Sequence, residues 1–133
     1  MALIARDRAH PPLAGQILLS PMLDPCAGTA SLRNATSDAA ECRWASGWEK
    51  YLSCPSNAMH PYAVPRRSLR LSSLAPALVL VGADDAMRDE ALTFAGRLRA
   101  AGIEVTSSVL PSASNWPKAL YDTENTGCVA CEA

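Results

Sequence analysis

The sequence predicts an α/β fold, with a parallel β-sheet that carries helices on its faces. Two short apolar runs, at 17–20 and 77–82, have the length and composition of buried strands. Two longer stretches, at 38–52 and 88–101, repeat apolar residues at helical spacing. Because these segments alternate along the chain, the strands that they connect are expected to run parallel.

The chain is expected to begin with the last turns of a helix, over residues 1–9. His10-Pro11-Pro12 ends this helix, because proline cannot continue a helix and restricts the residue before it. Ile17-Leu18-Leu19-Ser20 follows and predicts a strand that is buried on both faces. Residues 26–37 are small and polar, and they predict a loop.

A second helix is predicted from 38 to 52. Asp38 and Glu41 have the spacing of a helix N-cap and its reciprocal partner. Trp44 and Trp48 lie one helical turn apart, a spacing more typical of packing than of a binding site. Residues 54–76 contain four prolines and predict a long surface connection. Its three arginines are expected to be solvated, with an anion site as the alternative; they are Arg66, Arg67 and Arg70.

The second half of the chain has the clearest pattern. Residues 77–82 give the strongest strand signal, and 88–101 predict a helix that ends at Gly102. Residues 105–110 mix apolar residues with threonine and serine, and they predict a strand at or near a sheet edge. One face of the predicted helix is apolar and consists of Ala91, Phe94, Ala95 and Leu98.

Composition excludes several classes of function. The 133 residues carry a net charge of −1, and no basic excess indicates nucleic-acid binding. No apolar run is long enough to span a bilayer, and charges within the first ten residues disfavour a signal peptide. We therefore expect a cytoplasmic protein without a membrane partner.

The five cysteines do not predict a disulfide framework, because their number is odd and their spacing irregular. Cys128 and Cys131 form a C-x-x-C pair, but the sequence lacks a second pair at zinc-site spacing. A redox pair normally opens a helix after a strand, whereas the second cysteine of this pair is the third residue from the end of the sequence. A frayed tail is the better interpretation, and we expect neither a metal nor a cofactor.

Asp84 and Asp85 directly follow the strand predicted at 77–82. Active sites of parallel α/β folds lie beyond the carboxyl ends of the strands, so both aspartates are at a position typical of chemistry. The alternative is structural, because negative charge also stabilises the N-terminus of the helix that follows.

Three stretches resemble the hormone-sensitive-lipase-like esterase branch of the α/β-hydrolases, in the order that this family has them. They are LLSPMLDP at 18–25, HPYAVP at 60–65 and DAMRDE at 85–90, which is similar to the D-P-L-R-D-E motif of the family. The resemblance covers the C-terminal half of that fold and implies a partial hydrolase domain over 1–120, with an unassigned tail over 121–133. It also implies that Asp85 is the acid of a Ser-His-Asp triad, which accepts a hydrogen bond from the histidine.

The other parts of that triad are missing from the sequence. It contains no G-x-S-x-G motif and no His-Gly-Gly-type oxyanion segment. Asn115 stands about where the resemblance implies the histidine, and asparagine cannot act as a general base. His10 and His60 are the only histidines, and we expect both to be surface residues. Ser112 and Ser114 lie near the expected site without a visible base.

Three interpretations of a partial hydrolase remain open. The first is a truncated or remnant carboxylester hydrolase that is inactive alone. The second is a binding or assembly module that forms homo-oligomers through exposed sheet edges at 17–20 and 105–110. The third is one half of a split esterase, which would act on small acyl esters only when the missing half completes it.

Overall fold

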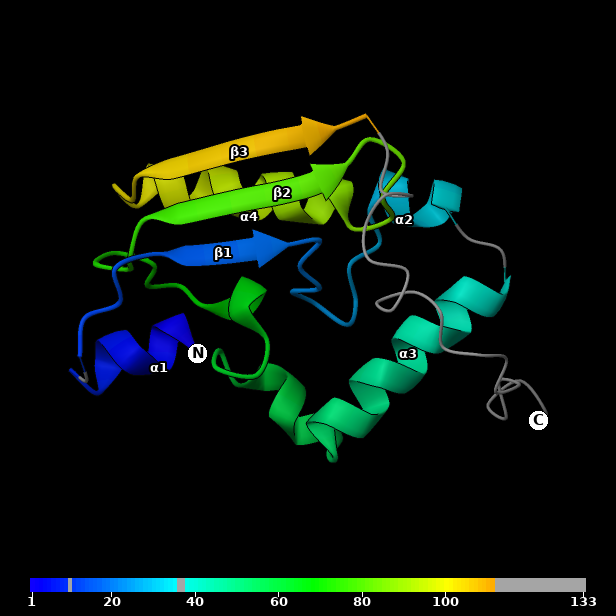
Figure 1. Cartoon of the computed structure of the whole chain (residues 1–133). Coiled ribbons are helices and arrows are strands. Elements are labelled where there is room, and N and C mark those ends of the chain that lie inside the picture. The colour runs from blue at the N-terminus through cyan, green and yellow to red at the C-terminus, as the bar shows by residue number, and fades with distance from the viewer. Residues whose placement is uncertain (10, 36–37, 112–133) are drawn as a thin grey trace.

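The computed structural model describes residues 1–9, 11–35 and 38–111, and these residues form a parallel sheet with flanking helices (Figure 1). The strands are β1 (Gln16–Leu19), β2 (Ala77–Gly82) and β3 (Val105–Leu110), in the spatial order β1-β2-β3. The helices are α1 (Ala2–Asp7), α2 (Ala30–Ala35), α3 (Asp38–Leu52) and α4 (Arg88–Ala100), with 3₁₀ turns at Pro55–Met59 and Pro65–Arg67. The predicted fold class is confirmed.

Helix α4 covers one face of the sheet and lies behind β2 and β3 in Figure 1. Val79 and Val81 of β2 pack there against Ala91 and Ala95 of α4, and all four side chains are buried. Small alanines allow the helix to approach the strand closely, while the valines fill the space between them. The apolar face predicted for this helix is therefore its sheet-packing face.

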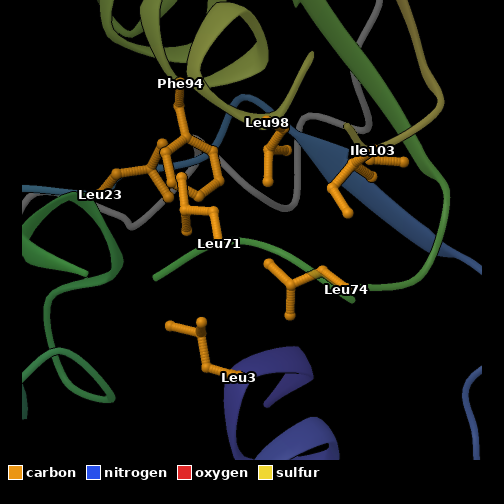
Figure 2. Packing of buried hydrophobic residues seen from close by; sticks show 8 residues of the cluster. Leu3, Leu23, Leu71, Leu74, Phe94, Leu98 and Ile103 are labelled. Carbon is orange, nitrogen blue, oxygen red and sulfur yellow. The ribbon is translucent and has the colours of Figure 1, made fainter. Parts of the chain in front are cut away.

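A second cluster of buried residues joins α1 and the segment before β2 to the C-terminal half of α4 (Figure 2). Leu3 of α1 and Leu74 point into it from one side, and Phe94 and Leu98 from the other. The segment 54–76 therefore supplies core residues, and its interpretation as a surface connection alone is wrong. Its buried apolar side chains are Val64, Leu71 and Leu74.

Two of the three arginines in this segment form ion pairs. Arg66 lies 3.4 Å from the Asp24 carboxylate, and Arg70 lies 3.3 Å from that of Asp7. Asp7 also accepts hydrogen bonds from Arg6 and from the Tyr62 hydroxyl, and these interactions lower its pKa to about 2. Arg66 and Arg70 therefore link the 54–76 connection to the turn after β1 and to α1.

The end of α4 follows the sequence prediction closely. Gly102 has φ +82°, a conformation that glycine adopts without strain. Its N–H donates to the Arg99 carbonyl at 2.9 Å, and the Ile103 N–H donates to the Leu98 carbonyl at 3.1 Å. These two bonds form a Schellman motif, which satisfies the last carbonyls of the helix and turns the chain toward β3.

Strand β1 differs from its prediction, because it is not buried on both faces. Ile17 is 72% exposed and Leu19 is 38% exposed, whereas Leu18 between them is half-buried against the core. Ile17 pairs with Leu78 and Leu19 with Leu80, so these four side chains lie on the same face of the sheet. No described helix crosses this face in Figure 1, and β1 forms one edge of the sheet as β3 forms the other.

Helix α2 lies within 26–37, where the sequence analysis expected only a loop. The Leu32 N–H donates to the Thr29 hydroxyl at 3.4 Å, and the Ser31 N–H donates to the Asp89 carboxylate at 2.8 Å. The second bond comes from a residue far along the chain, so local sequence could not reveal it. None of the described helices has the length and apolar character needed to cross a membrane.

Candidate active site

The carboxyl ends of β1 and β2 bring Ser20 and Asp85 together. Ser20 directly follows β1, and its N–H donates to the Leu80 carbonyl of β2 at 2.9 Å. Its φ of +41° lies in the left-handed region, which a non-glycine residue adopts at some cost in strain. Asp85 lies three residues after β2, and its N–H donates to the Gly82 carbonyl at 3.1 Å.

Both oxygens of the Asp85 carboxylate have a donor. The Ser20 hydroxyl donates to Oδ2, and the Met87 N–H donates to Oδ1 at 2.8 Å. The residue is only 7% exposed, so these bonds hold a carboxylate in one orientation at a largely dry position. Each carboxylate oxygen has a second lone pair, which leaves acceptor capacity for a further N–H donor.

The adjacent aspartates have different environments. Asp84 is exposed, whereas Asp85 is buried at the carboxyl end of the sheet. The Asp85 contact with the Met87 N–H also forms an Asx turn, one residue before α4 begins at Arg88. The structural role that the sequence analysis kept as an alternative is therefore present, and it uses only one of the two carboxylate oxygens.

A second contact fixes the start of α4 against α2. The Ser31 N–H donates to the Asp89 carboxylate at 2.8 Å, and the Asp89 N–H donates to the Ser31 hydroxyl at 3.1 Å. The Ser31 hydroxyl in turn donates to the Ala86 carbonyl at 2.9 Å. The Ser31 N–H, more than any other group, lowers the pKa of Asp89 and keeps it ionised. These bonds hold the start of α4, just after Asp85, against α2.

Glu90 makes a third contact, with the turn that follows β1. Its side chain is buried, with the residue 3% exposed, and Oε1 accepts the Leu23 N–H at 3.0 Å. Burial raises the pKa of Glu90 to about 7. The sequence analysis singled out neither Ser20 nor Glu90, although both lie inside the quoted LLSPMLDP and DAMRDE stretches.

An aromatic hollow lies beside this turn, between α3 and the residues around Tyr62. It has a volume of about 430 Å³. Trp44 and Trp48 are half-buried and line it, and both lie outside the two buried clusters. Their spacing predicted packing in the core, and this prediction is wrong. Met22, two residues after Ser20, lines the hollow from the other side.

Comparison of the sequence with known protein families identifies the family of this chain. The sequence profile of the alpha/beta hydrolase fold matches residues 1–114. The chain belongs to this family. Within it the chain lies in the hormone-sensitive-lipase-like esterase branch, in agreement with the sequence resemblance.

Solved structures of esterases are similar to this hydrolase chain. A thermostable esterase from Pseudomonas putida is 33% identical with a TM-score of 0.72, and the match covers 81% of this chain and 35% of the esterase. Esterase LipW from Mycobacterium marinum is 32% identical with a TM-score of 0.71, over 83% and 35% of the two chains. A hyperthermophilic esterase from Pyrobaculum calidifontis is 28% identical with a TM-score of 0.70, over 81% and 37%.

The hydrolase chain thus spans only a little over a third of the length of these esterases. No curated protein matches it. All three of these solved structures are esterases.

Of the alternative bases and nucleophiles that the sequence offered, only His60 lies within the described residues. It is exposed, its Nδ1 accepts the Tyr62 N–H at 3.2 Å, and its ring packs against Tyr62 at a centroid distance of 4.9 Å. These contacts are local and do not include Asp85. Outside the described residues lie His10, Ser112, Ser114, Asn115, the C-x-x-C pair and the tail 121–133. Among the described residues, no group of three potential metal ligands lies together.

Proposed function

We propose that this chain is the acid-bearing part of a carboxylester hydrolase, with Asp85 as the acid of the triad. Alone, the chain does not turn over esters. The carrying observation is the buried Asp85 carboxylate at the carboxyl end of β2, oriented by Ser20 and by the Met87 N–H. The first aspartate of the D-P-L-R-D-E-like stretch is the residue that has this position.

The chemistry assigned to Asp85 is positioning and electrostatic. In a complete triad its carboxylate accepts the N–H of a histidine, selects the tautomer and stabilises the imidazolium that forms as a serine attacks the ester. The 133 residues contain no G-x-S-x-G serine, and the described histidine, His60, contacts Tyr62 rather than Asp85. A small acyl ester is therefore a substrate only when other residues supply the nucleophile and the base.

The first test is hydrolysis of p-nitrophenyl acetate and p-nitrophenyl butyrate by the purified chain. Turnover is expected to equal that of the Asp85→Asn variant and of buffer, because nucleophile, base and oxyanion donors are all missing. Turnover that Asp85→Asn abolishes would contradict the proposal and would direct attention to His60 as an unrecognised base.

The acid role itself requires a complete site. A chimera in which residues 77–111 replace the matching segment of the Pseudomonas putida esterase keeps the nucleophile and base of that enzyme. Asp85→Asn in this chimera is expected to lower kcat by a factor on the order of 10³–10⁴, because the histidine loses its tautomer control. Asp84→Asn is the matched control and is expected to leave kcat within about twofold. Equal effects of both substitutions would remove Asp85 from the triad.

A second candidate function is assembly through β1, and one observation favours it. On the open face of the sheet, Ile17 pairs with Leu78 and Leu78 pairs with Thr106. The more exposed apolar residues Ile17 and Leu19 thus lie at the β1 side, whereas β3 presents the hydroxyl groups of Thr106 and Ser108 to this face and only Leu110, at its end, is apolar. An apolar edge strand recruits another strand, which a second copy of this chain or the missing half of a split esterase could supply.

Sedimentation velocity tests this assembly. A single defined dimer is expected, and Ile17→Lys is expected to dissociate it because the charge would be buried at the joined edge. Thr106→Lys, at the same level of the sheet on the opposite edge, is the matched control and should leave the dimer intact. A wild-type monomer, or equal dissociation by both variants, would reject assembly through β1.

A further inference from the structure

The turn at 21–25 connects two parts of the candidate site. At its start, Ser20 donates a hydrogen bond to the Asp85 carboxylate. Within it, Met22 lines the aromatic hollow beside Trp44 and Trp48. The next residue, Leu23, is buried in the main apolar cluster and lies beside Phe94 in Figure 2. The position of this short turn therefore fixes both the donor on Asp85 and one wall of the hollow.

Polar contacts hold the backbone of this turn from two sides. The Leu23 N–H donates to Glu90 Oε1 at 3.0 Å, and the Leu23 carbonyl accepts the Arg66 N–H at 3.4 Å. The Arg66 guanidinium also pairs with the Asp24 carboxylate at 3.4 Å. Glu90 belongs to the first turn of α4, the helix that begins three residues after Asp85. It thereby links the turn after β1 to the helix that follows the proposed acid.

We propose that Glu90 is a positioning residue: its carboxyl group fixes the turn at 21–25, and its protonation changes the positions of Ser20 and Met22 together. The effect on Asp85 as an acid rests on the proposed function, but the movement of the turn does not. A buried glutamate is a costly way to bind one backbone amide, unless it is protonated or the turn supplies further compensation.

The charged groups around Glu90 make this protonation accessible near neutrality. Burial and, to a smaller extent, the Asp24 carboxylate on the turn together raise its pKa to about 7. The backbone amides of Leu23 and Asp24 and the Arg66 guanidinium act in the opposite direction. Asp89, its neighbour on α4, instead faces Ser31 of α2. The ionised form accepts the stronger, charge-assisted bond from Leu23, so this bond weakens as the pH falls below 7.

Nuclear magnetic resonance on the whole chain tests the proposal without requiring catalysis. Between pH 5 and 8.5, the amide resonances of Ser20, Leu23 and Asp24 and the methyl resonance of Met22 are expected to share one midpoint near 7. Glu90→Gln keeps the size of the side chain and removes the titration, so all four resonances should become flat. Glu104→Gln, at an exposed carboxyl before β3, is the matched control and should leave the midpoint unchanged.

Two further variants keep the proposal testable if Glu90→Gln does not fold. Asp24→Asn removes a charge that raises the pKa and should lower the common midpoint, whereas Arg66→Gln should raise it. Midpoints that shift in the same direction, or a Leu23 titration that persists in Glu90→Gln, would overturn the assignment. Titration of Leu23 and Asp24 without Ser20 and Met22 would also overturn it. Equal effects of Asp85→Asn and Asp84→Asn in the esterase chimera, beside a normal titration, would instead count against the proposed function alone.

Discussion

The two faces of the small sheet differ sharply in how completely the described residues cover them. On the covered face, Val79 and Val81 are fully buried against α4. On the other face, Leu78 and Leu80 of the same strand are only half-buried, and Ile17 beside Leu78 is mostly exposed. Strands of parallel sheets normally have both faces covered. The described part of the chain therefore forms one complete layer and leaves the other open.

The covered face is held by contacts within the chain, whereas the open face is available for contacts with another chain. The end of the sheet that holds Asp85 has its carboxylate, its turn and the start of α4 fixed by contacts within the chain. The open face near β1 has apolar side chains that the described residues do not cover. We expect the covered layer and the Asp85 end to set stability, and the open face to set association.

The largest effect is expected where the covered layer is broken. Leu98→Ala should lower the free energy of unfolding by about 2–5 kcal/mol, because Leu98 is fully buried and its truncation leaves a cavity. Ile17→Ala removes a similar side chain from the open face and should change stability by less than about 0.5 kcal/mol. Urea unfolding at low protein concentration measures both. Similar losses in the two variants would mean that the two faces are equally packed.

The elements of this layer could be predicted because their signals are local. Residues 77–82 and 88–101 gave the strand and helix almost at their observed bounds, and Gly102 marked the end of the helix. Exposure of Ile17 could not be predicted in this way, because an apolar run looks the same whether or not a neighbour covers it. Helix α2 was missed because the Asp89 carboxylate that binds its first turn comes from a distant part of the chain.

The candidate site, like the fold, could be predicted only where its signals are local. Asp85 followed from its place after a strand and from the resemblance of DAMRDE to an esterase motif. Its donor Ser20 and the contact of Glu90 with Leu23 join residues that are 65 and 67 positions apart. Such pairings depend on the strand order β1-β2 and on where α4 packs, so a single sequence contains no local pattern for them.

An intermediate effect is expected at Glu90, and it depends on pH. Its pKa is about 7 in the folded chain and 4.5 as the ordinary value, so the folded state binds the proton more tightly. The stability that protonated Glu90 contributes is therefore lost as the pH rises from about 4.5 to 7. Relative to Glu90→Gln, the wild-type chain should lose roughly 2–3 kcal/mol between pH 5 and 8, because most of the pKa shift from 4.5 to about 7 falls in this range at about 1.4 kcal/mol per pKa unit.

Urea unfolding of both proteins across this pH range measures the difference. Asp7 and Asp89 have lowered pKa values, so they remain ionised throughout and do not contribute to the slope. The two histidines are present in both proteins, and their contributions cancel in the comparison. Parallel stability curves for wild type and Glu90→Gln would show that the Glu90 carboxyl titrates alike in folded and unfolded chains.

The smallest effect compares two serines, one at each region. Ser31→Ala should cost about 1 kcal/mol, because it removes the hydroxyl that bonds the Asp89 N–H and the Ala86 carbonyl at a buried position. Ser108→Ala, on the exposed surface of β3, should cost less than about 0.5 kcal/mol. Amide exchange of Asp89 distinguishes a local from a general loss: Ser31→Ala should speed it while leaving β2 protected. Equal costs in both variants would show that the α2–α4 contact adds nothing to the order of the Asp85 loop.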